Sequence, residues 1–191
     1  MILTDIAGIP LDDARFEAFW ARANEIGLLV HIHPTVPAVP GHASAFALTL
    51  AVAFMGETAL AIARLTFAGI FERYPRIRWV FSHLGGTIPF IFHRLDTYYQ
   101  QFPECREHIT QPPSWYVRRV FYDTVSTHRP ALRCTQETVG IGQMVFGSDY
   151  PHVPGGPRPF LAALDALDMS ESQRADLLGG RALRLLNGQE G

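Results

Sequence analysis

Apolar positions along the chain recur with two different periods, and each period predicts one kind of element. From Leu11 to Ile26 they recur every three or four residues, which is typical of an amphipathic helix. Asp12 and Asp13 stand at its start, where carboxylates accept unpaired backbone N–H groups, and Gly27 provides the stop. The residues expected on its buried face are Phe16, Phe19, Trp20, Ala23 and Ile26.

Four short apolar runs further along the chain predict buried strands. They are Leu28–His33, Arg78–His83, Arg119–Thr124 and Gln143–Gly147. Helices are predicted at Ile88–Gln100, Pro130–Val139, Phe160–Leu167, Ser170–Leu178 and Arg181–Leu186, and Ser170 and Gln173 are spaced as a capping box. Strands that alternate with helices indicate a parallel sheet with helical crossovers, so the fold class is α/β.

The segment between the first two strands is the least regular. A loop rich in proline and glycine is expected at 34–41, followed by a mostly helical stretch, Ala45–Tyr74, interrupted near Gly56. The longest apolar stretch is Ala43–Met55. Because a bilayer crossing takes about 20 residues, we expect this stretch to be a buried helix. A loop is predicted at Phe102–Ser114.

The amino-acid composition indicates a broad class of protein but not its chemistry. Its 191 residues are 48% hydrophobic and 18% charged, which predicts one globular domain over residues 1–191. A net charge of −2 argues against nucleic acid or a membrane surface as a partner. Cys105 and Cys134 lie far apart and are expected to be unpaired thiols. No secretory signal pattern follows Met1, so we expect a cytoplasmic protein.

Candidate chemistry lies where the predicted strands end. His33, His83 and Asp149 each follow a strand, and the carboxyl ends of parallel strands form one face. Imidazole and carboxylate groups that converge there can bind a divalent metal or transfer protons. Taken singly, each histidine is more often a hydrogen-bonded structural residue, and the aspartate a helix cap. Their shared placement favours a functional site. The third strand ends in Asp123, for which a structural role is equally compatible.

His31 lies two residues before His33, so both side chains point to the same face of the strand. One interpretation is a metal-binding His-x-His pair of the kind that opens an amidohydrolase barrel, but only three further strands are predicted after it. We favour the other interpretation, in which His33 is the functional residue and His31 lines the barrel.

Several segments resemble the amidohydrolase-related decarboxylases, the family of aminocarboxymuconate semialdehyde decarboxylase and γ-resorcylate decarboxylase. They are LDDARFEAFWARANEIGLLVHIHP, ERYPRIRWVFSHLGGTIPFIFHRLD, VFYDTVS, VFGSDYPH and DLLGGRALRLLN, the last with Arg181 where an asparagine is usual. The resemblance implies a metal-dependent (β/α)8 barrel. Because the expected first strands are missing, we expect about the last four βα units, truncated on the N-terminal side.

The resemblance also implies roles for individual residues. His33 and Asp149 would be metal ligands from the fifth and eighth barrel strands, and His83 and Asp149 would be catalytic and handle protons. Arg94 would assist carboxylate binding across a dimer interface, although a solvated helix face is an equally good interpretation. His31 and His152 would contact substrate, and His152, Tyr122 and Asp123 are weaker candidates.

These features predict a non-oxidative decarboxylase of small aromatic or unsaturated carboxylic acids. The expected cofactor is a divalent metal, zinc first and manganese second, and a homo-oligomer is expected because an incomplete barrel leaves an open sheet edge. A lactone or C–C bond hydrolase on the same fold is the alternative enzyme, because the same ligands serve both reactions. A non-catalytic remnant is the third hypothesis.

Overall fold

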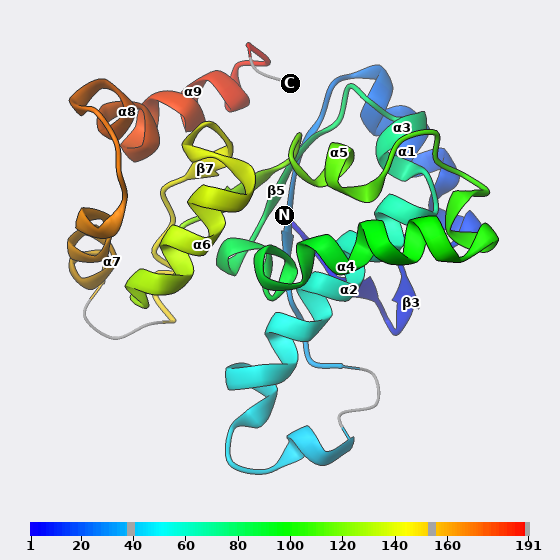
Figure 1. Cartoon of the computed structure of the whole chain (residues 1–191), viewed down its shortest axis with the longest axis horizontal. Coiled ribbons are helices and arrows are strands. Elements are labelled where there is room, and N and C mark those ends of the chain that lie inside the picture. The colour runs from blue at the N-terminus through cyan, green and yellow to red at the C-terminus, as the bar shows by residue number, and fades with distance from the viewer. Residues whose placement is uncertain (38–40, 153–155, 190–191) are drawn as a thin grey trace.

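The computed structural model describes residues 1–37, 41–152 and 156–189, and its centre is a parallel sheet (Figure 1). The strands in order across the sheet are β1 (Ile2–Leu3), β4 (Leu29–His33), β5 (Arg78–Phe81), β6 (Phe121–Asp123) and β7 (Met144–Val145). Every neighbouring pair is parallel. The four predicted strands are confirmed. The fifth, β1, was missed because two residues are too short for a periodic pattern.

Helices lie between successive strands of this sheet and after β7, which gives the βα repeat of part of a (β/α)8 barrel. They are α1 (Glu17–Glu25), α2 (Phe54–Phe67), α3 (Ile70–Arg73), α4 (Ile88–Gln101), α5 (Pro113–Val117), α6 (Arg129–Val139), α7 (Arg158–Ala163), α8 (Glu171–Ala175) and α9 (Arg181–Leu186). Short helical turns occur at Ala14–Phe16, Gly41–Ser44, Thr49–Ala53, His83–Gly85, Pro103–Arg106, Ile141–Gln143, Leu164–Ala166 and Asp176–Gly180. An antiparallel hairpin, β2 (Asp5–Ile6) and β3 (Ile9–Pro10), follows β1.

The two faces of the sheet are covered differently, and β4 shows why. Burial alternates along this strand: Val30 and Ile32 are buried, whereas His31 and His33 are only partly buried. Val30 and Ile32 belong to the main core, which lies between the sheet and the helices on its outer face. Because side chains alternate along a strand, both histidines face the opposite side, the barrel interior. The apolar residues packed on that inner face are Val80, Phe121, Val145 and Leu185 of α9.

The first predicted helix is confirmed as α1 with a short turn before it. The Asp13 side chain accepts the Arg15 backbone N–H at 3.0 Å. Trp20 is 1% exposed, but Phe19 and Ile26 are 44% and 52% exposed, so their predicted burial is wrong. The buried stripe of this helix is narrower than the sequence pattern, because one large indole fills the available space.

Two smaller predictions are also confirmed. The Ser170 side chain accepts the Gln173 backbone N–H, and the Gln173 side chain accepts that of Ser170, which is the predicted capping box at the start of α8. Cys105 and Cys134 are both free thiols.

The predicted helix break near Gly56 is wrong, because α2 runs through that residue and the chain turns at Gly69 instead. Gly56 has a helical backbone, and a Cβ added to it would meet no atom within 4 Å, so nothing there requires glycine. Gly69 has φ of 71°, and a Cβ at that residue would lie 2.2 Å from the His108 carbonyl oxygen. A left-handed conformation and a close backbone approach both need glycine.

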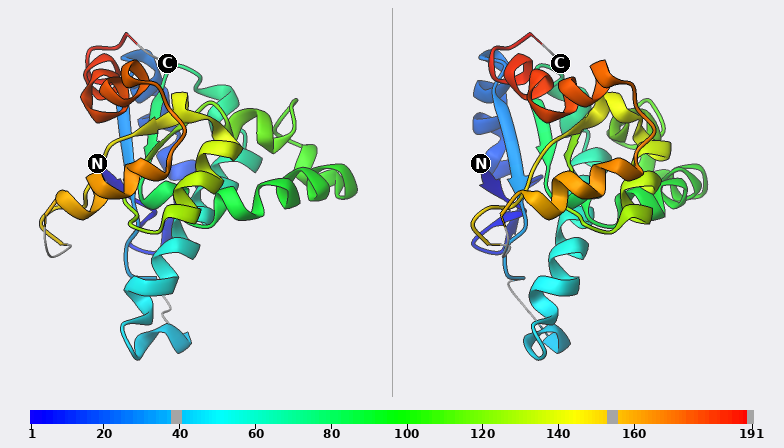
Figure 2. Two further views of the ribbon diagram at one scale, coloured as in Figure 1. Left: turned by 60° about the vertical axis from the view of Figure 1, so that its left-hand side comes forward. Right: turned by 90° about the vertical axis from the view of Figure 1, so that its left-hand side faces the viewer.

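The predicted burial of Ala43–Met55 is also wrong, because none of its residues is buried. This segment leads into α2 through the turn at Thr49–Ala53 and extends away from the rest of the molecule (Figures 1 and 2). Phe46 is 92% exposed and Leu50 61%. Helix Thr49–Phe67 is long and apolar enough to cross a membrane, and 33% of its most apolar 18-residue stretch is buried. The core helix of a soluble protein meets the same criteria, so length and composition alone assign no membrane span.

Candidate metal centre

Three side chains from three strand ends meet at the carboxyl edge of the sheet. His33 is the last residue of β4, His83 follows β5, and Asp149 follows β7. Nε2 of His33 lies 3.6 Å from Oδ1 of Asp149, and Nε2 of His83 lies 3.7 Å from Oδ2 of the same carboxylate. The possible ligand atoms all lie within 4.8 Å of one another. Within residues 1–37, 41–152 and 156–189, this is the one such group of His, Cys, Asp or Glu.

A tight left-handed turn places His83. Its φ is 54° and that of Leu84 is 58°, and both values are costly for residues other than glycine. Gly86 follows with φ of 64°, and a Cβ there would lie 2.2 Å from the Met55 carbonyl oxygen. Gly86 is therefore required by the close approach of helix α2, and Gly85 by the Tyr122 ring, which would lie 2.6 Å from an added Cβ.

Asp149 also has a left-handed backbone, with φ of 53°. It lies in the loop after β7, and a cis peptide bond joins the next two residues, Tyr150 and Pro151. The Asp149 carbonyl accepts the His152 backbone N–H at 2.8 Å, which closes a turn around the carboxylate. The loop thus holds the Asp149 side chain between the two histidines.

The hydrogen bond made by His33 fixes which ring nitrogen faces the aspartate. Nδ1 of His33 lies 2.9 Å from the Pro34 carbonyl oxygen, which can only accept. Nδ1 therefore carries a proton, and in the neutral ring Nε2 presents its lone pair to Asp149. A lone pair and a carboxylate oxygen do not attract each other. A cation between them, either a metal ion or a proton on Nε2, makes the arrangement favourable.

The His83 side chain is more buried than that of His33. Burial lowers the pKa of His83, although the nearby carboxylates of Asp123 and Asp149 oppose the shift. Its Nδ1 is buried and has no hydrogen-bond partner. A neutral imidazole with one nitrogen toward Asp149 can accept a proton or ligate a metal. Two imidazole nitrogens and a carboxylate form a donor set that suits a divalent transition metal, so these residues fit the predicted cofactor.

The remaining predicted residues on the inner face share one cavity with this centre. The cavity measures about 560 Å³, and His31 and His152 line it together with His33 and Asp149. The His31 side chain is 38% exposed, and its Nε2 lies 2.9 Å from Ser82 Oγ and 3.6 Å from Asp123 Oδ2. The predicted position of His31 on the barrel-facing side is therefore what the structure shows.

Arg94 lies elsewhere. It is exposed on α4, does not line the cavity, and its guanidinium stacks on the Tyr98 ring at 5.4 Å while donating to the Tyr98 hydroxyl at 3.0 Å. In this chain Arg94 lies on an exposed helix face, and its role across a dimer interface stays a prediction.

The two weaker candidates on β6 differ from each other. Tyr122 is fully buried on the outer face, its hydroxyl donates to the Val117 carbonyl at 2.6 Å, and burial raises its pKa well above the usual range. It is a core residue. Asp123 is 5% exposed and contacts His31 and His83 from the inner face. Sequence reasoning missed Ser82, although its position two residues after Val80 places it on that same face.

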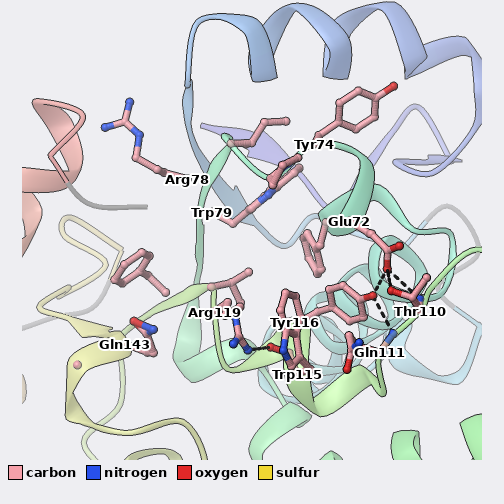
Figure 3. A pocket seen from close by; sticks show the side chains of 16 residues that line it. Glu72, Tyr74, Arg78, Trp79, Thr110, Gln111, Trp115, Tyr116, Arg119 and Gln143 are labelled. Carbon is pink, nitrogen blue, oxygen red and sulfur yellow. Dashed lines mark hydrogen bonds between the residues drawn. The ribbon is translucent and has the colours of Figure 1, made fainter.

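A larger cavity of about 740 Å³ lies at the other end of the strands, and Figure 3 shows its side chains. There the Glu72 carboxylate accepts hydrogen bonds from the Tyr116 hydroxyl and the Thr110 backbone N–H. Arg119 donates to the Trp115 carbonyl and stacks on its ring. These polar groups satisfy one another, so the smaller cavity at the carboxyl edge is the better candidate for chemistry.

A partial parallel barrel with histidine and aspartate side chains at its carboxyl edge defines a class of metal-dependent barrel enzymes. The Amidohydrolase family model matches residues 2–188, and the chain belongs to that family.

Similar proteins agree with this assignment. The chain is 28% identical over 96% of its length to a 2-amino-3-carboxymuconate-6-semialdehyde decarboxylase of Dictyostelium discoideum, and covers 51% of that protein. It is 29% identical over 92% of its length to a 6-methylsalicylic acid decarboxylase of Penicillium expansum, and covers 55% of it. The chain thus spans about half the length of the curated relatives it matches.

Solved structures show the same fold. A 5-carboxyvanillate decarboxylase from Sphingomonas paucimobilis superposes with a TM-score of 0.86 at 26% identity, covering 98% of this chain and 58% of that one. Another from Novosphingobium aromaticivorans, solved with manganese, gives a TM-score of 0.84 at 24% identity, covering 98% and 56%.

Proposed function

We propose that the chain carries the metal centre of a non-oxidative decarboxylase that acts on small aromatic or unsaturated carboxylic acids. The observation that carries the proposal is the pairing of His33 Nε2 and His83 Nε2 with the two oxygens of one carboxylate, Asp149. Membership of the Amidohydrolase family and similarity to named decarboxylases of small carboxylic acids support the reaction class.

His33 and Asp149 would hold the divalent ion, with the His33 ring fixed by its hydrogen bond to Pro34. When bound, such an ion stabilises negative charge on substrate oxygens as a Lewis acid. Zinc suits imidazole and carboxylate donors. Manganese accepts the same donors, and it is the ion in the decarboxylase structure from Novosphingobium aromaticivorans.

In the proposed reaction, the bond between the substrate carbon and its carboxylate breaks. Carbon dioxide leaves, the electron pair stays on the carbon, and that carbon then takes a proton, so the product is the substrate with hydrogen in place of the carboxyl group. His83 would move this proton, because its Nε2 lies 3.7 Å from Asp149, which lines the cavity.

The volume and the lining residues of the cavity suit a substrate with one small ring. About 560 Å³ lies within the range of ordinary ligand sites. Leu29, Val80 and Val145 supply apolar wall against which a planar ring can pack, and His31 and His152 supply polar groups for its substituents. The proposed substrate therefore lies with its ring against the strands and its carboxyl group toward the metal centre.

Elemental analysis and carbon dioxide release together test the proposal. The 191-residue chain, loaded with zinc or manganese and freed of excess metal, should retain one ion per chain and release carbon dioxide from 6-methylsalicylate or 5-carboxyvanillate. His33→Ala should abolish both, while His93→Asn, which alters an exposed histidine on α4, should abolish neither. A metal-loaded chain that releases no carbon dioxide from these acids would refute the reaction, and absence of metal retention would refute the centre.

We also propose that the protein forms a homo-oligomer in the cytoplasm. The exposed apolar side chains of Phe46, Leu50 and Val52, together with Phe90 at 87% exposure, support assembly because such groups gain from burial. In an assembly, Arg94 is free to approach the cavity of a second copy. Light scattering after gel filtration tests this, and a mass of 21.3 kDa in solution would refute it.

A further inference from the structure

Asp123 is a buried carboxylate that contacts strand β4 and the segments that follow β5 and β6. It is the last residue of β6 and is 5% exposed. Its Oδ1 accepts the His83 backbone N–H at 2.7 Å and the Val125 backbone N–H at 3.0 Å. Its Oδ2 lies 3.6 Å from Nε2 of His31 on β4. Burying a charged group costs free energy unless the group is hydrogen-bonded. These contacts therefore stabilise the buried carboxylate at this position.

The bond to His83 anchors a strained turn. His83 and Leu84 both have left-handed backbones, with φ of 54° and 58°. Such conformations are costly and persist only where surrounding contacts determine them. The Asp123 carboxylate accepts the backbone N–H of His83, the first residue of this turn. Because the acceptor is ionised, this hydrogen bond is stronger than one between neutral groups. It fixes the point from which the His83 side chain projects toward Asp149.

The loop that carries Asp149 packs directly on Asp123. A Cβ added to Gly147 would lie 3.0 Å from the Cβ of Asp123, so the two segments approach closely at this point. Two residues further on is Asp149. Asp123 thus lies between the loop of His83 and the loop of Asp149, the two groups whose separation defines the metal centre.

The second oxygen of Asp123 orients His31. Nε2 of His31 faces both Asp123 Oδ2 and the hydroxyl of Ser82, which is 1% exposed. A carboxylate can only accept, so this contact favours the His31 tautomer with its proton on Nε2. The ring is then held by two buried groups, while part of it remains exposed to the cavity.

We propose that Asp123 is a positioning residue, which through one carboxylate holds the His83 turn at the metal centre and orients the His31 ring toward substrate. It touches neither the proposed metal nor the reacting carbon. The proposal deepens the decarboxylase function proposed above and rests on it for its functional consequence.

The unmodified chain provides the first test. A scalar coupling across the hydrogen bond should link the His83 amide nitrogen to the Asp123 side-chain carboxyl carbon, and the His83 amide proton should be protected from solvent exchange. A rapidly exchanging His83 amide without this coupling would overturn the proposal. This measurement needs neither metal nor turnover, and it stands even where substitutions at Asp123 prevent folding.

The second test compares Asp123→Asn with Glu72→Gln, which removes a hydrogen-bonded carboxylate from the far end of the sheet. Ring ¹⁵N shifts of His31 and His83 should move in the first variant and stay in the second. Manganese affinity should fall by about tenfold or more in Asp123→Asn alone, as for other residues that orient metal ligands. Unchanged ring shifts in folded Asp123→Asn would overturn the proposal. If the unmodified chain binds no manganese, the proposed function fails, and the ring shifts still decide the role of Asp123.

Discussion

Nε2 of His33 lies 3.6 Å from Oδ1 of Asp149, and the proton on the other nitrogen of that ring is committed to the Pro34 carbonyl. In the neutral ring, two electron-rich atoms therefore face each other at the carboxyl edge of the sheet. The nearby ring of His83, with its centroid 5.1 Å from that of His33, adds a third donor. Without a cation this arrangement is unfavourable, and a bound metal should therefore stabilise the folded chain.

A divalent metal should raise the thermal stability of the chain, and Asp149→Asn should remove this effect. A ligand that binds the folded state at about a hundred times its Kd stabilises that state by about 2.7 kcal/mol. Melting curves recorded with increasing zinc or manganese measure the shift. Asp165→Asn, which loses an exposed ion pair with Arg174, serves as the control and should retain the full metal response. An equal response in Asp149→Asn would contradict the assignment of that residue as a ligand.

Gly86→Ala should destabilise the protein because the turn that carries His83 has no space for a side chain. The added Cβ would lie 2.2 Å from the Met55 carbonyl oxygen in a backbone with φ of 64°. We expect a loss of about 2–4 kcal/mol in the free energy of unfolding, measured by urea titration. Gly56→Ala is the control, because that glycine is helical with no atom near the added Cβ, and should stabilise by about 0.5–1 kcal/mol.

Acid should weaken the contact between Glu72 and the segment that starts α5. Hydrogen bonds from the Tyr116 hydroxyl and the Thr110 backbone N–H lower the pKa of Glu72 from its usual 4.5. A carboxyl pKa that is lower in the folded state adds stability above pH 4.5, and this stability disappears as pH falls through the folded value. The difference in unfolding free energy between the unmodified chain and Glu72→Gln should therefore be largest near neutral pH and shrink on acidification. A difference independent of pH would contradict this account.

The convergence of the three candidate residues could be predicted because it follows from topology. Parallel strands bring their carboxyl ends to one edge, so a polar residue at the end of each predicted strand was enough to group His33, His83 and Asp149. The alternation in β4 likewise placed His31 on the inner face. The sheet brings the three segments to one edge, while the left-handed backbones at His83 and Asp149, which the sequence pattern did not predict, set how their side chains meet.

Features that depend on close contacts between distant segments could not be predicted. The break at Gly69 arises because the His108 carbonyl lies against it, and residue 108 is remote in sequence. The exposure of Ala43–Met55 was missed for a related reason, since an apolar composition gives no information about whether another segment covers it. The role of Asp123 depends on the His83 amide, a partner that no pattern along β6 identifies.

Arg181 should contribute to stability although it does not line the cavity of the metal centre. It is 5% exposed, donates to the carbonyls of Ile141 and Met144, and pairs with Asp176. Its guanidinium thus joins α9 to the start of β7. Arg181→Ala removes a buried donor from these carbonyls and one of the two arginines that pair with Asp176, which keeps Arg184, so we expect a loss of about 1–3 kcal/mol in the free energy of unfolding.

Chemical denaturation of Arg181→Ala against the exposed Arg133→Ala measures this cost, and the second variant should lie within about 0.5 kcal/mol of the unmodified chain. Arg181→Met separates packing from charge, because it keeps much of the apolar stem while still losing the hydrogen bonds. We expect it to recover only part of the loss, since the two carbonyls remain without their donor. Full recovery by methionine would show that the stem, rather than the guanidinium, joins α9 to β7.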